Sequence, residues 1–472
     1  MRRSSIVAPL LLIGIGLLFL IRNLHPDLPL VDYLAKFWPF ILVLWGVVRL
    51  FEIAVWAASS KPLPSAGVSG GEWVLVAFLC LFGLSLHTIH GMAEWWPRNG
   101  FAGGMNMFGE SFEYPIGGEK ACSPTPRVVL ENFRGGARIT GADVNSVKVT
   151  GRKTVRSLDQ SGADRGNQDS PFELAGDATR VIVRNNQDRV HGPVRISAEM
   201  EITVPRGASV EAHGRGGDFE ISDIGGSVEI VSDSAGVRLN NIGGDARMDL
   251  RRSDLVRAVN VKGTVDLKSR GSDIEMDSID GPVTVSGSYS GVVQFHNLAK
   301  PLRYTGVQTE LHIERLPGQV RMALNNFNGS NLVGPVRLTS RSRDVQISDF
   351  TNTLEVSVDR GDIDLRPNQT PLARIQARTK SGDVILSLPP SSQFTLTATT
   401  DQGETTNDYG PPVNAQTERR GGSLHGSVGS GPTVNVQTGR GNITVRKASP
   451  GDAAPAMSHV PSSSEPLKRL EQ

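Results

Sequence analysis

Aspartates recur at one class of turn in the second half of the chain, and their carboxylates are the first side chains in the sequence that could do chemistry. Six fall at equivalent turns: Asp218, Asp254, Asp273, Asp344, Asp362 and Asp383. If the turns stack, several carboxylates form a ladder, and a hard cation such as Ca²⁺ takes several oxygen ligands. The candidate calcium ligands are Asp254, Asp273, Asp362 and Asp383.

The same turns have a purely structural explanation. Aspartate favours turns because its side chain accepts hydrogen bonds from nearby backbone amides. The Gly-Gly-x-Gly-x-Asp spacing of calcium-binding nonapeptides is not repeated in this sequence. We therefore expect these aspartates to cap backbone amides, and we predict no resident metal or cofactor.

Catalytic motifs are missing from the sequence. It contains no HExxH or P-loop motif and no Cys/His pair that could form a nucleophile and its base. His87 and His90 lie on one face of a predicted helix, but two histidines without a carboxylate are a weak metal signal. We expect a non-enzymatic protein, with a polysaccharide-active β-helix enzyme as the minor alternative because such sites need only convergent carboxylates.

The aspartate turns belong to a repeat. Nine turn positions are separated by steps of 18, 18, 19, 18, 19, 34, 18 and 21 residues, namely Asp218, Gly236, Asp254, Asp273, Gly291, Glu310, Asp344, Asp362 and Asp383. We interpret the step of 34 as two coils of about 17 residues. A second class of Gly or Pro turn falls midway. The pattern predicts an all-β, single-stranded β-solenoid (β-helix or β-roll-like) over residues 127–446, with about 18 residues and two strands per coil.

Apolar and polar residues alternate within each predicted strand, so one set points inward. The predicted inward residues are Ile221, Val228, Ile230, Val237, Leu239, Met248, Leu250, Val265, Leu267, Ile274, Met276, Val283 and Val285. Charged residues between them point outward, and we expect Arg247, Asp266, Glu275 and Arg337 to share one face. Residues 127–213 and 393–446 are irregular and are the predicted end caps, because an open terminal coil exposes a strand edge.

The first 96 residues have a different composition and contain all six tryptophans. Apolar runs near 6–21, 37–58 and 73–89 predict a transmembrane anchor of about three α-helices over residues 1–96. Arg2 and Arg3 place the N-terminus in the cytoplasm by the positive-inside rule, so three crossings carry the remaining chain to the far side. The predicted location is the cell (inner) membrane, multi-pass, with the solenoid extracytoplasmic and the lipid bilayer as a partner.

Two further segments are predicted to lack regular structure. Residues 97–126 are rich in Gly and Pro and read as a linker, and residues 447–472 have the composition of a disordered tail. The net charge of +1, with acidic and basic residues interspersed, gives no reason to expect nucleic acid as a partner. The two cysteines, Cys80 and Cys122, provide no disulfide framework.

Two resemblances add to this interpretation. The string from Pro9 to Asn23, followed by Phe37-Trp-Pro-Phe-Ile-Leu-Val-Leu-Trp-Gly46, resembles the paired-helix membrane region of LiaI/LiaF-type envelope-stress proteins (DUF5668-type). The segments Ile202-Thr-Val-Pro-Arg-Gly207, Arg360-Gly-Asp-Ile363, Ser381-Gly-Asp-Val384 and Gly439-Arg-Gly-Asn-Ile-Thr-Val445 resemble the adhesin-like β-solenoid domains of the DUF4097 type. These resemblances imply a bacterial envelope protein and carry no catalytic residue.

Two non-enzymatic functions follow from the sequence. In the first, the solenoid is an adhesin-like binding or scaffolding surface for envelope polysaccharide or another envelope protein, because a flat face repeats polar side chains at a fixed spacing. In the second, the anchor and the ectodomain form an envelope-stress sensor or regulator of the LiaF type.

Overall fold

The computed structural model describes residues 110–190, 194–417 and 419–449. Contacts divide the chain into two units, Met1–Met105 and Asn106–Gln472, and the described residues all belong to the second. The predicted anchor helices, residues 97–109 of the predicted linker and residues 450–472 of the predicted tail lie outside the described residues. Within the described ranges, no helix is long and apolar enough to cross a membrane.

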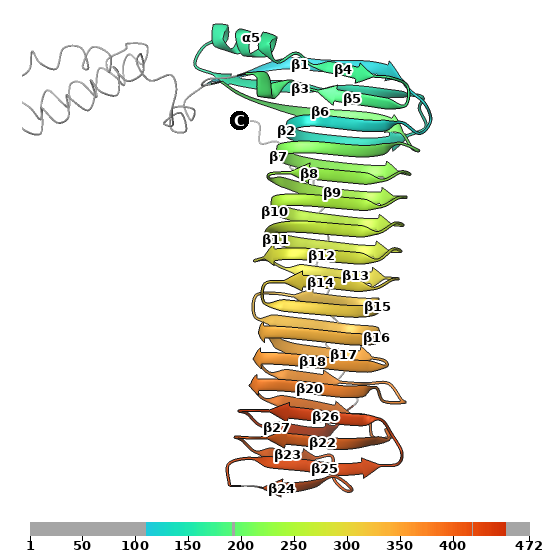
Figure 1. The fold of residues 1–472 in the computed structure, drawn as a ribbon, viewed down its shortest axis with the longest axis vertical. Coiled ribbons are helices and arrows are strands. Elements are labelled where there is room, and N and C mark those ends of the chain that lie inside the picture. Colours follow the sequence, from blue (N-terminus) through green and yellow to red (C-terminus); the bar gives the residue numbers. More distant parts are fainter. Residues whose placement is uncertain (1–109, 191–193, 418, 450–472) are drawn as a thin grey trace, which may run out of the picture. The chain divides into compact units, whose positions relative to one another are not determined.

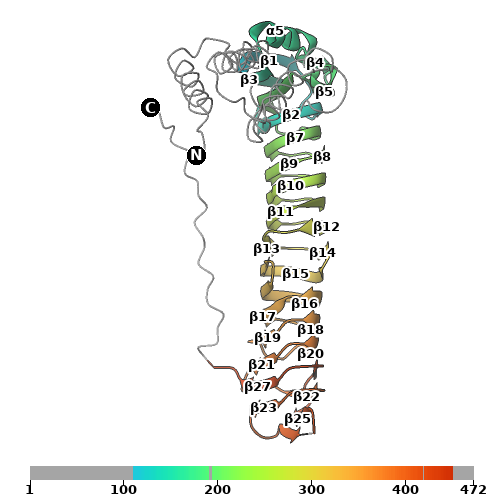
Figure 2. The same ribbon diagram turned by 90° about the vertical axis from the view of Figure 1, so that its left-hand side faces the viewer.

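The described part of the chain is almost entirely β-structure, which confirms the all-β prediction. It contains 27 strands, one α-helix, α5 (Gln160–Asp169), and one 3-10 helix, η1 (Gln187–Arg189). The strands stack along one axis (Figures 1 and 2). Because long strands cross the corner between the two sides of the stack, all 27 strands are hydrogen-bonded into one continuous sheet.

Two ladders of strands run along the stack, one on each side of the core. Ladder 1 contains, among others, the segments that carry Val210, Val228, Ala246, Val265, Val283 and Leu302. Ladder 2 contains the segments that carry Phe219, Val237, Val256, Ile274 and Val293. In both ladders the paired residues are 18 or 19 positions apart, as the repeat predicted.

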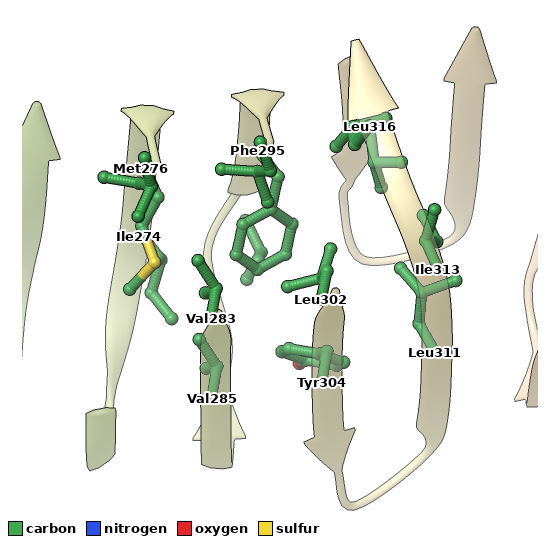
Figure 3. Close-up of a cluster of buried hydrophobic side chains, with 14 of the residues drawn as sticks. Ile274, Met276, Val283, Val285, Phe295, Leu302, Tyr304, Leu311, Ile313 and Leu316 are labelled. Carbon is green, nitrogen blue, oxygen red and sulfur yellow. The ribbon is translucent and has the colours of Figure 1, made fainter. Parts of the chain in front are cut away.

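From β7 to β14 the strands follow one another along the stack in chain order and pair in parallel. Its strands are β7 (Ser209–Ile224), β8 (Val228–Ser232), β9 (Ala235–Ile242), β10 (Ala246–Val261), β11 (Val265–Ile279), β12 (Val283–Tyr289), β13 (Val293–Leu298) and β14 (Leu302–Gly306). All 13 residues that were predicted to point inward are at most 2 % exposed. They form one apolar core between the ladders, part of which Figure 3 shows around Met276, Phe295 and Tyr304.

The chain reverses direction in the middle of the stack, which the sequence interpretation missed. β15 (Thr309–Met322) runs antiparallel to both β13 and β14. β16 (Asn326–Ser342) runs antiparallel to β15 and restores the original direction. The 34-residue step is therefore two layers, but not two parallel coils. The Arg343 guanidinium contacts both turns of this reversal. It donates hydrogen bonds to the Thr309 hydroxyl at the start of β15 and to the Ala323 carbonyl just after its end.

Beyond the reversal, the strands are again parallel until the C-terminal end, where the order along the stack departs from the order along the chain. The strands are β17 (Asp344–Phe350), β18 (Thr353–Arg360), β19 (Ile363–Arg366), β20 (Arg374–Ser381), β21 (Val384–Leu388), β22 (Phe394–Thr400), β23 (Thr405–Asp408), β24 (Asn414–Thr417), β25 (Gly422–Val428), β26 (Thr433–Thr438) and β27 (Ile443–Lys447). β26 lies between β20 and β22, and β27 lies between β21 and β23. The last two strands, β26 and β27, thus form a layer that lies between two earlier layers. The antiparallel strands β25 and β24 end ladder 1.

The N-terminal end is closed by a cap in which some strand pairs are antiparallel and others are parallel. This cap contains β1 (Glu110–Ala121), β2 (Arg127–Ala142), β3 (Ser146–Ser157), β4 (Glu173–Gly176), β5 (Arg180–Arg184) and β6 (Arg195–Pro205). β1 corrects the linker prediction, because all 12 of its residues pair with β3 despite Pro115, Gly117 and Gly118. Edge strands tolerate proline and glycine that a central strand would not. Helix α5 covers a small separate apolar cluster that includes Val155, Ala163 and Ile196.

Candidate binding surface

The aspartates at the repeating turns bind backbone amides of the neighbouring layer. Asp344 Oδ1 accepts a hydrogen bond from the Asp362 amide at 3.0 Å, and Asp362 Oδ1 accepts one from the Asp383 amide at 2.8 Å. Asp383 Oδ1 accepts one from the Asn442 amide at 2.7 Å, and Asn442 Oδ1 accepts one from the Glu404 amide at 2.9 Å. These side chains form a capping ladder over five layers, and it continues through the inserted strand β27.

Glycine immediately precedes the capping residue in most layers of this ladder. Gly382 has a φ of +150°, and a Cβ at that position would lie 2.0 Å from the Gly361 carbonyl oxygen. Only glycine adopts this conformation without strain. Backbone geometry and amide capping therefore explain the Gly-Asp turns in Arg360-Gly-Asp-Ile363 and Ser381-Gly-Asp-Val384.

The N-terminal half of the stack contains a less regular version of the ladder. Asp218 Oδ1 accepts a hydrogen bond from the Gly236 amide at 3.2 Å, and Asp273 Oδ1 accepts one from the Val292 amide at 2.7 Å. Asp254 does not belong to this column, because Leu255 is the residue that pairs with Asp273. Of the calcium candidates, Asp273, Asp362 and Asp383 each cap an amide, and Asp254 is one residue out of register.

No group of three or more His, Cys, Asp or Glu side chains within residues 110–190, 194–417 and 419–449 is placed to hold a metal ion. In the capping ladder, one carboxylate oxygen of each aspartate is already engaged by an amide hydrogen. These aspartates cap backbone amides, which is a common role of Asp at turns.

A second ladder of polar side chains lies at another corner, and the sequence interpretation missed it. Asp223, Asn241 and Asn260 adopt left-handed backbone conformations with φ near +57°, and buried Ile or Val residues follow them. The Asn241 amide donates to Asp223 Oδ1 at 2.9 Å, and the Asn260 amide donates to Asn241 Oδ1 at 2.6 Å. Asn and Asp tolerate this conformation better than other residues with a side chain, so the recurrence of Asn or Asp before a buried aliphatic residue was the available signal.

A groove of about 390 Å³ lies on the outer face of ladder 2 near the N-terminal cap. Its walls are charged: Arg138 binds Glu220 at 3.0 Å, and Arg152 binds Glu113 at 3.0 Å. Gly136 has no side chain and leaves space between its neighbours. The backbone amide of Gly136 donates a hydrogen bond to the Glu199 carboxylate. These charges largely satisfy one another, so the groove has no strong preference for ligands of either sign.

The outer face of ladder 1 carries rows of polar side chains in its C-terminal part. Two columns of side chains follow it from β16 to β24. The first contains Arg337, Glu355, Gln376, Asn435, Thr397, His425 and Asn414, and the second contains Thr339, Ser357, Arg378, Gln437, Thr399, Ser423 and Gln416. A groove of about 190 Å³ runs between the columns over β16, β18 and β20. We call this surface the polar face.

The expectation that four charged residues share one face is wrong in one detail. Arg247, Asp266 and Arg337 lie on ladder 1, whereas Glu275 lies on ladder 2, where it binds Arg257 at 3.3 Å. Glu275 directly follows the predicted turn at Asp273, so it belongs to the second strand of its coil, on the other side of the stack from Asp266.

One buried ionisable side chain lies far from the polar face. Lys153 is 2 % exposed beside α5, and its ammonium donates to the carbonyl oxygens of Ser170 at 2.6 Å and Asn167 at 3.1 Å. Burial lowers the pKa of Lys153 to about 8. The group fastens the C-terminal end of α5, where cations are favoured by the exposed carbonyls.

The stacked fold and its repeating corners can be compared with known families. Residues 139–446 match the model of the Toastrack DUF4097 family. The chain belongs to the Toastrack DUF4097 family. Residues 7–110 match the LiaF transmembrane domain, in agreement with the resemblance of the N-terminal segment. Together the two matches indicate a membrane-anchored envelope protein whose described part contains the Toastrack match.

Two solved structures are similar to this chain at low levels. One is a candidate cell adhesion protein from Clostridium sporogenes, with 11 % identity, a TM-score of 0.14, and coverage of 71 % of this chain and 100 % of that chain. The other is a candidate adhesin from Bacteroides fragilis, with 11 % identity, a TM-score of 0.18, and coverage of 71 % and 97 %. With TM-scores this low, neither likeness carries an argument here. No curated protein matches the chain.

Proposed function

We propose that this protein is a non-enzymatic component of the cell envelope that presents its β domain as a binding or scaffolding surface. We interpret the stack as a flattened β-solenoid held on the extracytoplasmic side of the cell membrane by about three helices. The observation that carries the proposal is the pair of continuous side-chain columns on the outer face of ladder 1, because each strand adds equivalent positions at a fixed spacing. Such a surface suits multivalent binding, in which contacts after the first are intramolecular and add avidity.

The second candidate function is envelope-stress sensing or regulation of the LiaF type. The match of residues 7–110 to the LiaF transmembrane domain favours it. In that case, the membrane region would bind the partner, and the β domain would have an accessory role.

Complementation separates the two functions. In a strain that lacks the protein, we expect the full chain to restore the envelope phenotype and residues 1–96 alone to fail. Restoration by residues 1–96 would overturn the binding-surface proposal in favour of the regulator. The matched control is a full chain with an exposed-loop substitution, Ser391→Ala, which we expect to restore the phenotype.

The proposed topology needs a probe other than the native cysteine. Cys122 is half-buried, and burial raises the pKa of its thiol, so the reactive thiolate is scarce. We expect a Ser391→Cys variant, whose side chain is exposed, to react with a membrane-impermeant thiol reagent from outside in spheroplasts. Labelling of this variant only after lysis would place the β domain in the cytoplasm.

A further inference from the structure

The chemistry of the polar face identifies a class of partner. Over the five strands β20, β26, β22, β25 and β24, the two columns provide ten positions, two on each strand. Arg378 and His425 are the only ionisable residues among the ten, Ser423 is buried, and the other seven are Gln376, Asn435, Gln437, Thr397, Thr399, Asn414 and Gln416. Hydroxyl and amide groups both donate and accept hydrogen bonds.

Several of these groups are free to bind a ligand. Among the described residues, the side-chain amides of Gln376, Asn435 and Gln437 have no hydrogen-bond partner, and Asn435 and Gln376 are exposed. No large hydrophobic side chain, the kind that most often anchors a protein partner, is exposed on these five strands. The large hydrophobic residues that are exposed within the described ranges are Leu158, Val231, Val307 and Leu324, all on other parts of the chain.

The spacing of the columns also restricts the partner. Neighbouring strands are about 4.8 Å apart, and alternate residues of one strand are about 7 Å apart. An extended glycan chain advances by close to one strand spacing per sugar ring, so a chain that lies along the stack can present successive rings to successive strands. The groove over β16, β18 and β20 runs between the same columns and continues this path.

We propose that the polar face, from β20 to β24, binds a neutral polysaccharide that lies along the stack between the two columns. The inference rests on the proposed function, since it names the partner of the binding surface. Sugar hydroxyls and acetamido groups match the amides and hydroxyls of the columns, and Arg378 is the one permanently charged side chain among the ten positions. A polyanion would require a row of cations, which these columns do not provide.

The experiment uses the full chain in nanodiscs and chitin beads as the neutral polysaccharide. We expect retention on chitin that persists at high salt, because salt screens ion pairs but not contacts between neutral groups. The double variant Asn435→Ala/Gln437→Ala should reduce retention at least tenfold. The matched control, Thr406→Ala/Thr444→Ala, removes exposed or half-exposed polar groups from β23 and β27 in the corresponding layers of ladder 2 and should leave retention unchanged.

Each other outcome overturns the inference in a distinct way. Retention that is equal for wild type and the Asn435/Gln437 variant would place the glycan site elsewhere. If wild type is not retained on chitin but is retained on isolated cell envelopes, the neutral-glycan partner is wrong and the binding-surface function stands. Retention on neither material would overturn both. If the Asn435/Gln437 variant changes only the sedimentation of the nanodisc-embedded protein, the face binds a second copy of this chain. Circular dichroism of both variants checks that the fold is intact.

Discussion

The outer face of ladder 1 changes its chemistry along the stack, while the inner face does not. Over β7, β8, β10 and β11 the two columns contain Glu211, His213, Glu229, Val231, Arg247, Asp249, Asp266 and Lys268. Over β26, β22, β25 and β24 they contain only amides, hydroxyls and one histidine. Most inward residues in both regions are buried aliphatic or aromatic side chains, with a few buried hydroxyls such as Ser232 and Thr438.

This difference separates what the fold requires from what it leaves free. The core needs apolar residues at alternate positions, because they provide the burial that stabilises the stack. Corners need glycine or a capping residue. Outward positions on the strands have no such requirement, so a consistent chemistry over four neighbouring strands is a property that binding can explain and folding does not.

The largest expected effect tests whether the two regions share one kind of core. Phe219 in the charged region and Phe394 in the polar region are both fully buried, and each ring contacts another aromatic ring, Phe133 at 5.9 Å and Tyr409 at 5.2 Å between centroids. We expect Phe219→Ala and Phe394→Ala each to reduce the free energy of unfolding by about 3–5 kcal/mol. Urea unfolding of the two variants measures it. A loss below about 1 kcal/mol for Phe394→Ala alone would mean that the C-terminal layers do not share the common core.

A lysine is buried at the N-terminal end of the stack, Lys153, and a lysine is exposed at the C-terminal end, Lys447. We expect only the buried lysine to make stability depend on pH. The pKa of buried Lys153 is about 8 in the folded protein, below its ordinary value of 10.5. Between these values the unfolded chain binds more protons, so stability rises as pH increases from 8 to 10.5, by at most about 3–4 kcal/mol at roughly 1.4 kcal/mol per unit. We expect Lys153→Met to abolish this dependence in urea titrations.

The control for this pH effect lies at the opposite end. Lys447 is exposed, and its ammonium lies 5.2 Å from the centre of the Tyr409 ring. Lys447→Met should keep the rise in stability between pH 8 and 10.5, because Lys153 is unchanged. A flat profile in wild type, or an equal rise in the Lys153→Met variant, would show that Lys153 does not cause the effect.

The capping ladder gives a smaller effect and tests the calcium hypothesis. Asp383→Ala leaves the Asn442 amide without its hydrogen bond, and Asp273→Ala does the same to the Val292 amide. We expect each substitution to cost about 1–2 kcal/mol in urea unfolding. Because the carboxylates cap amides, adding calcium or a chelator should leave the melting temperature of wild type unchanged. A calcium-dependent increase that Asp383→Ala abolishes would restore the calcium interpretation.

The sequence predicted those parts of the fold that depend on local pattern. Alternation located all 13 proposed inward residues, such as Met276 and Val285, and the Gly-Asp turns gave the layer spacing. The reversal at β15 was not predictable from the pattern, because a strand that runs backwards presents the same alternation of apolar and polar residues. The insertion of β26 between β20 and β22 depends on pairing across 59 positions, from Ile375 to Val434, which no local signal specifies.

The candidate site was predictable only in outline for the same reason. Asn435 and Gln376 are far apart in sequence and become neighbours in one column only because β26 is inserted beside β20. The sequence indicated that a flat face repeats polar side chains. It did not reveal that the uncharged side chains gather at the C-terminal end of one ladder.

The smallest expected effect on stability comes from removing exposed charges on the outer face of ladder 1. The Arg337–Glu355 pair is 2.8 Å long, but its side chains are 71 % and 40 % exposed, and exposed ion pairs contribute little because water and salt screen them. We expect Arg247→Gln, Asp266→Asn and Arg337→Gln each to change the free energy of unfolding by less than about 0.5 kcal/mol in urea titrations. If the uncharged end of ladder 1 alone binds glycan, Arg247→Gln and Asp266→Asn should also leave retention on chitin unchanged, since both residues lie outside β20 to β24. A graded loss of retention as these charges are removed, with stability intact, would assign binding to the charged strands β10 and β11 and would reverse the functional contrast between the two regions.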